Sequence, residues 1–66
     1  MNWDQIEGSW KQHKGKIMSK WGKLTEDDIE SIKGKRTKLI GLLQTHYGHA
    51  KEQAEDEIDQ WTKQIM

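Results

Sequence analysis

Apolar side chains recur along this chain at intervals of three, four or seven residues, and this spacing restricts the fold more than any other feature of the sequence. Three stripes of this kind cover residues 3–24, 29–47 and 50–65. Such intervals place side chains on one face of an α-helix. No segment alternates β-branched and polar residues as a half-buried strand does. The pattern therefore predicts an all-α fold.

Capping and turn residues divide the chain into about four helices. Thr25 stands directly before three acidic residues, so its hydroxyl can accept a hydrogen bond from the first helical turn while the carboxylates favour the helix dipole. Gly22 and Gly48 each follow an aromatic residue and are expected to end helices in the left-handed conformation. Gly34 is expected to bend or end the short helix that follows Thr25. The remaining helices are expected over residues 35–47 and 49–64.

The glycines follow a common rule. They form two sets with seven-residue spacing, 8, 15, 22 and 34, 41, 48, and a shift of 26 residues superimposes the two sets. The same shift places Trp3 on Ile29. We weigh a degenerate internal repeat of a helical unit against chance agreement between amphipathic helices. The repeat predicts a helix break at Gly8, with Ser9 capping a helix that begins at Trp10.

Glycine inside a helix needs a reason, because it costs about 1 kcal/mol relative to alanine. Our structural interpretation is that a neighbouring helix approaches the backbone closely at Gly8, Gly15 and Gly41. The functional alternative is flexibility or a contact groove.

Length and composition limit the function. The chain has 66 residues, no Cys, no Pro, and 11 Lys+Arg against 11 Asp+Glu, which predicts one small domain over residues 1–66. A chain of this size cannot easily enclose a deep catalytic pocket, and the absence of Cys excludes thiol nucleophiles and thiolate metal sites. We therefore expect no enzyme and no cofactor. The longest apolar run is Leu42-Leu43, so we expect no membrane span, no secretory signal and a cytoplasmic location.

Charge alternates by segment along the chain. Residues 1–24 carry a net charge of +3, residues 25–31 carry −4, residues 32–49 carry +4 and residues 50–66 carry −3. We expect the first and third segments to pack beside the second and fourth. Exposed ion pairs contribute only about 0–1 kcal/mol each, so they bias the arrangement more than the stability.

Four tryptophans are the largest side chains available for a core. Trp10 and Trp21 lie inside the first stripe and are expected to be buried, where each contributes roughly 1.5–3 kcal/mol. Trp3 and Trp61 lie near the chain ends and are expected to be exposed, which makes them candidates for contact with a partner.

A basic cluster is the argument for nucleic-acid binding. Phosphates attract clustered cations, but the net charge is zero and acidic segments can lie over the bases. An internally compensated surface is therefore favoured, and nucleic acid stays an alternative. The candidate interaction surface comprises Trp3, Trp61, Lys33, Lys35, Arg36 and Lys38.

The imidazoles do not predict a metal site. His46 and His49 flank Gly48, but no Cys and no well-placed carboxylate completes a zinc site. We expect no bound metal. His13 lies on the first apolar stripe, so we expect a half-buried packing role for it.

Several stretches resemble the CsbD family of bacterial general-stress proteins, and its short branch in particular. They are WKQHKGK at residues 10–16, KWGKLTEDD at 20–28, GKR at 34–36, YG at 47–48 and KEQAE at 51–55. The resemblance covers residues 2 to about 61, and the WGKLT-x-DD stretch is its most specific part. His13 stands where an aromatic residue such as Phe is common in the family.

The resemblance implies a small cytoplasmic protein of four or so helices arranged in a manner similar to SAM-like domains, with two orthogonal helical hairpins as one such arrangement. It implies raised abundance under stress but no established reaction, and it carries over no catalytic or ligand-binding residues. We therefore expect a monomeric, non-enzymatic stress-response protein of unknown biochemical activity, with an interaction or protective role and an unidentified protein partner. Weak nucleic-acid binding through the Lys-rich helices and self-association as a helical adaptor are the alternatives.

Overall fold

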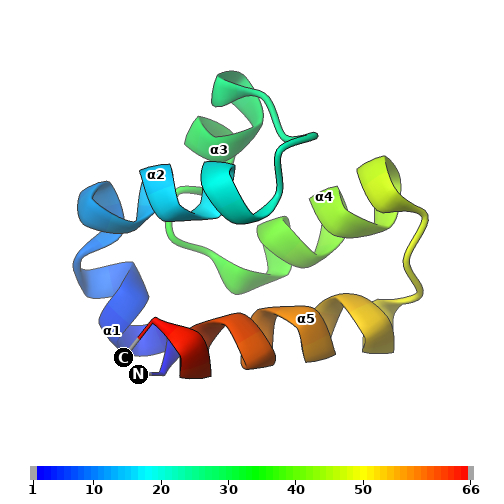
Figure 1. Ribbon diagram of the computed structural model, residues 1–66. Coiled ribbons are helices and arrows are strands. Elements are labelled where there is room, and N and C mark those ends of the chain that lie inside the picture. The colour runs from blue at the N-terminus through cyan, green and yellow to red at the C-terminus, as the bar shows by residue number, and fades with distance from the viewer. Residues whose placement is uncertain (1, 66) are drawn as a thin grey trace.

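The computed structural model describes residues 2–65, which form an all-helical chain without strands. The helices are α1 Trp3–Gly8, α2 Trp10–Lys20, α3 Glu26–Ile32, α4 Arg36–Tyr47 and α5 Lys51–Gln64. Helices α4 and α5 run antiparallel, and the start of α1 lies at the same end of the molecule as the end of α5 (Figure 1). The predicted all-α class is confirmed.

The fold has five helices rather than about four because the first helical segment is broken. Ser9 leaves the helical conformation with φ −122° and ψ 44°, and its N–H donates to the carbonyls of Gln5 and Ile6. The break at Gly8 that the repeat predicts is confirmed. The expected side-chain cap is wrong, because the Ser9 hydroxyl donates backward to the Gln5 carbonyl at 2.8 Å. The Ser9 carbonyl instead accepts the N–H of Gln12 at 3.0 Å.

The predicted start of α3 is confirmed at Thr25. Its hydroxyl accepts the N–H of Asp28 at 3.1 Å, and the Asp28 carboxylate accepts the N–H of Thr25 at 3.0 Å. This reciprocal capping box satisfies two backbone donors that the first turn leaves without helical partners. A second box, between Asn2 and Gln5, begins α1.

The expected helix ends hold at two glycines and fail at a third. Gly48 ends α4 in the left-handed conformation with φ 67°, and the chain after α3 turns through Lys33 at φ 51° and Gly34 at φ 80°. Gly22 does not adopt a positive φ. Helix α2 ends before it, at Lys20, because Trp21 turns out of the helix with ψ 79°.

Helix α5 begins two residues later than expected. Ala50 precedes it in an extended conformation, with φ −69° and ψ 158°, so the first helical residue is Lys51 rather than His49.

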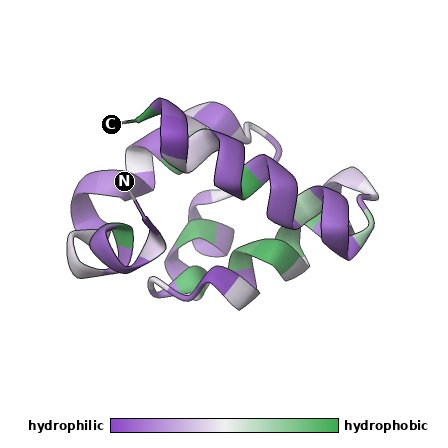
Figure 2. Cartoon of the chain, turned by 90° about the horizontal axis from the view of Figure 1, so that it is seen from below, coloured by the Kyte–Doolittle hydropathy of each residue, from purple (hydrophilic) through white to green (hydrophobic). Residues whose placement is uncertain are grey.

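One core unites residues from all five helices. The three apolar stripes supply it, and Figure 2 shows that hydrophilic residues dominate the outer turns of α5 whereas α4 carries the longest hydrophobic stretch. The buried apolar residues are Ile6, Ile17, Trp21, Leu24, Ile29, Ile32, Leu39, Ile40, Leu43, Ala54, Ile58 and Trp61. No helix within residues 2–65 is long and apolar enough to cross a membrane.

The proposed close approach at the helical glycines is wrong. A Cβ atom added at Gly8, Gly15 or Gly41 would meet no atom within 4 Å. A neighbouring helix therefore does not require these glycines, and the backbone they expose faces open space. Gly34 differs, because its added Cβ would lie 3.0 Å from Cγ of Glu7.

Ion pairs join segments of opposite charge, as predicted. Lys14 of α2 pairs with Glu30 of α3. Arg36 of α4 lies 3.6 Å from Glu55 and 3.1 Å from Asp59, both on α5. The alternating charge of the sequence therefore corresponds to ion pairs between α2 and α3 and between α4 and α5.

Candidate interaction surface

Trp3 and the basic segment after α3 are brought together by a hydrogen bond across the fold. Trp3 Nε1 donates to the carbonyl oxygen of Gly34 at 2.8 Å. The left-handed turn at Lys33 and Gly34 presents this carbonyl, and the Asn2 cap fixes the start of α1. This hydrogen bond joins two residues that are 31 positions apart in the sequence. Lys33 and Lys35, on either side of Gly34, are exposed.

Trp10 joins this corner from the start of α2. Its ring lies 6.2 Å from that of Trp3, with 53° between the planes, and both rings are half-buried. Trp10 was expected to be buried, but it is the first residue after the break at Ser9, so one side of the ring stays open. A hollow of about 470 Å³ lies beside it along residues 7–12. We call Trp3, Trp10, Lys33 and Lys35 the aromatic corner.

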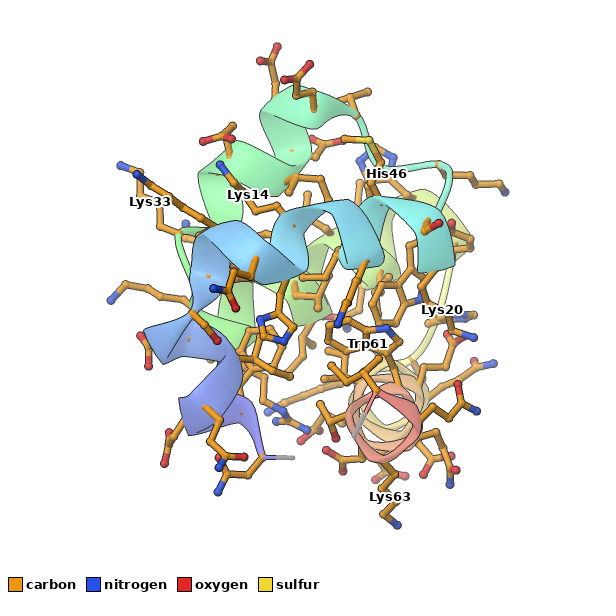
Figure 3. The ribbon with its side chains drawn as sticks, turned by 60° about the vertical axis from the view of Figure 1, so that its left-hand side comes forward. Lys14, Lys20, Lys33, His46, Trp61 and Lys63 are labelled. Atoms are coloured by element: carbon orange, nitrogen blue, oxygen red, sulfur yellow. The ribbon has the colours of Figure 1, made fainter. Side chains whose placement is uncertain are left out.

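Trp61 does not belong to this surface. It is only 3% exposed, and its ring packs on Trp21 with 5.5 Å between centroids and 59° between planes. The expectation of an exposed Trp61 is wrong because position 61 lies on the same face of α5 as the buried Ala54 and Ile58. Figure 3 shows Trp61 directed from α5 towards α2.

The remaining two basic residues of the candidate surface differ in their availability. Arg36 is directed to α5, where Glu55 and Asp59 hold it, so its guanidinium already has partners. Lys38 is exposed on the first turn of α4. The aromatic corner thus keeps three of the six predicted residues, Trp3, Lys33 and Lys35, and gains Trp10. The signal for Trp10 was its place directly after the predicted break.

The imidazoles serve as links between elements. His46 Nε2 lies 3.1 Å from Asp28 and ties α4 to the start of α3, whereas His49 pairs with Glu57 of α5. His13 is only 4% exposed, so it is more deeply buried than its predicted half-buried role, and its Nδ1 lies 3.0 Å from the Ser9 carbonyl. Within residues 2–65 no group of three or more metal-ligating side chains gathers.

The fold alters the ionisation of Asp28. The hydrogen bond from the Thr25 backbone N–H holds the pKa of Asp28 below its ordinary value, against the opposing effect of desolvation. The Thr25 side chain and the charge of His46 lower the same pKa further. These effects stabilise a structural carboxylate at a helix start.

What the aromatic corner offers chemically is apolar and cationic contact area. Two half-exposed indoles supply rigid apolar area, and two ammonium groups supply a positive rim, which is the combination that interfaces use to anchor a partner. Glu7 lies against Gly34 at the same corner, so the corner is only moderately positive.

Comparison with known proteins finds consistent similarity. The family model described as CsbD-like matches residues 4–56. UPF0337 protein YjbJ of Escherichia coli O6:H1 is 54% identical over 63 residues, which cover 96% of this chain and 91% of that protein. UPF0337 protein RPA4217 of Rhodopseudomonas palustris is 51% identical over 61 residues, covering 92% of each. The names of these relatives state no activity.

Proposed function

The chain belongs to the CsbD-like family, and from this premise we propose that it is a bacterial general-stress protein that acts by binding a partner and not by catalysis. The observation that carries the proposal is the aromatic corner, where Trp3 and Trp10 are held half-exposed beside Lys33 and Lys35. The family resemblance supports the stress association and a cytoplasmic location. The shared core of all five helices supports residues 1–66 acting as one domain.

The corner suits a protein segment with an apolar side chain and carboxylates. Tryptophan buries a large area at little cost in conformational entropy, and lysines at the rim steer acidic partners towards the site. Because the hydrogen bond from Trp3 to Gly34 fixes the first indole, the surface is ordered before binding.

Capture from stressed cells tests this function. The chain is used as bait beside two variants with the same change in net charge. Lys33→Glu/Lys35→Glu alters the corner, and Lys51→Glu/Lys63→Glu alters the exposed ends of α5. We expect mass spectrometry to show partners retained by the unaltered chain and by the α5 variant, and lost by the corner variant. Equal retention by both variants, or no retained partner at all, would contradict binding through the corner.

Single-stranded nucleic acid is the second candidate for the same corner. Exposed tryptophan beside lysines can stack on a base while the ammonium groups contact phosphates, and this juxtaposition favours it over the unspecific charge argument. Retardation of a short labelled oligonucleotide at low ionic strength, weakened by added salt, is the expected result for this candidate. A chain that causes no retardation at low ionic strength removes it.

A further inference from the structure

The solvent face of α2 carries only positive charge. Residues 8–25 contain no Asp or Glu, and α2 buries His13 and Ile17. Lys11 and Lys16 are exposed on the two flanks of this solvent side and have no ion-pair partner among residues 2–65. We call these two lysines the basic face of α2.

The solvent face of α5 carries mostly negative charge. Glu52, Asp56 and Asp59 are exposed and follow one another at intervals of four and three residues, so they lie along one side of the helix. Arg36 contacts only the last of them, and Lys63 stands at the far end of the helix. We call the three carboxylates the acidic face of α5.

These two faces point in opposite directions. Trp21, which follows α2, packs on Trp61 of α5 in the core, so the core lies between the two helices and their exposed sides are turned away from each other. In Figure 3, α2 and α5 lie on either side of Trp61, and Lys63 points away from α2. One chain therefore cannot bring its own basic face to its own acidic face, whereas a second copy can.

We propose that the chain binds a second copy of itself head to tail, with the basic face of α2 on the acidic face of α5. The centre of the basic face is low enough for a helix to approach, because Gln12, Gly15 and Ser19 lie between the lysines and an added Cβ at Gly15 meets nothing within 4 Å. Each copy uses two different patches once, so the contact is heterologous and continues as a chain or closes as a ring.

The contact is electrostatic and therefore weak and dependent on salt. The lysines and carboxylates of both faces are exposed, and screening shortens the reach of exposed charges to about 8 Å at physiological ionic strength. The dilute chain accordingly stays monomeric, as the sequence analysis expects, and association grows with concentration. The inference uses other residues than the aromatic corner, so it stands or falls separately from the proposed function.

Sedimentation equilibrium over a concentration series tests the association. At about 0.01 M salt, where the Debye length is about 30 Å, the average mass should rise with concentration, and at about 1 M salt it should not. Lys11→Gln/Lys16→Gln should weaken the association roughly tenfold or more. The matched control, Lys33→Gln/Lys38→Gln, also removes two positive charges, but neither residue belongs to either face. This control should associate like the unaltered chain. Equal weakening in both variants overturns the proposal.

A reversal of both faces gives a second, independent readout. Lys11→Glu/Lys16→Glu alone makes both faces acidic and should abolish association. Adding Glu52→Lys/Asp56→Lys to the same chain restores zero net charge with the faces exchanged, and it should regain the association. Circular dichroism confirms that each variant is helical. A folded fourfold variant that stays monomeric overturns the proposal, as does an unaltered chain that binds an oligonucleotide through α2 but shows no self-association at low salt.

Discussion

At the residue scale, the tryptophans divide into two structural and two surface members, and stability measurements should separate them. Trp21 and Trp61 are 2% and 3% exposed, so replacing either by alanine leaves a cavity and should lower the free energy of unfolding by roughly 3–5 kcal/mol. Replacing the half-buried Trp10 by alanine should lower the free energy of unfolding by only about 1–1.5 kcal/mol. Urea denaturation followed by circular dichroism measures all three. A Trp61→Ala variant with an unchanged midpoint would contradict the buried pair.

Asp28 makes the stability depend on pH in a predictable direction. Its pKa is lowered in the folded chain, so the ionised form is favoured by folding. Its contribution is fully present above the ordinary value of 3.8 and is lost as pH falls through the lowered folded value. The difference in unfolding free energy between the unaltered chain and Asp28→Asn should therefore stay level from about pH 6 to about pH 4 and shrink as the pH falls to about 3 and below. A difference that stays constant over this range would exclude the role of Asp28 ionisation.

The sequence predicted some of these residues better than others for a physical reason. Thr25 was recognisable because a helix cap depends on neighbours within three residues. The burial of Trp61 was missed because its nearness to the chain end was weighed above its place on the same apolar stripe as Ile58. The bond from Trp3 to Gly34 joins positions 31 residues apart, and no local pattern encodes such a partner. The sequence could therefore predict some residues of the aromatic corner, but it could not predict that these residues lie together.

At the element scale, the 26-residue shift places α4 within one residue and α3 only in part. Applied to α1 and α2, it gives 29–34 and 36–46, against α3 and α4 at Glu26–Ile32 and Arg36–Tyr47. The breaks differ in backbone conformation, since Lys33 and Gly34 have positive φ whereas Gly8 and Ser9 do not. The glycine spacing thus predicted where the units break, while the turn geometry was set by what each break must contact.

The helical glycines give a prediction of opposite sign to the turn glycine. Gly15→Ala and Gly41→Ala add a Cβ that meets no atom within 4 Å, so each should raise the free energy of unfolding by up to about 1 kcal/mol through helix propensity. Gly34→Ala should lower it by about 1–3 kcal/mol, because position 34 has φ +80° and the new Cβ would crowd Glu7. Thermal and urea denaturation of the three variants measure the signs. Destabilisation by Gly15→Ala would mean that a contact in solution uses the bare backbone.

At the scale of the whole molecule, charge blocks select neighbours without supplying much stability. The sequence predicted that positive segments lie beside negative ones, and the pairs Lys14 with Glu30 and Arg36 with Asp59 confirm it. It could not predict which side chains pair, because several partners lie within reach on each helix and exposed pairs differ by less than about 1 kcal/mol. The charges left over after pairing, on the outer sides of α2 and α5, depend on that unpredictable choice.

Arg36 tests how much these pairs contribute. It serves two carboxylates, Glu55 and Asp59, which stand four residues apart on α5. Arg36→Ala therefore removes two ion pairs and leaves two like charges facing each other on one helix, so it should lower the free energy of unfolding by about 1 kcal/mol, against about 0.5 kcal/mol for Lys14→Ala.

Salt and a second substitution separate charge from packing at Arg36. If the loss is electrostatic, it should shrink at about 1 M salt, where screening acts within about 3 Å. Asp59→Asn in the Arg36→Ala background should also recover part of it, because one of the two facing charges is gone. Urea denaturation at both salt concentrations measures the four chains. A loss that neither salt nor Asp59→Asn reduces would assign the role of Arg36 to its aliphatic stem, packed between α4 and α5, and the α4–α5 pairing would then rest on the core alone.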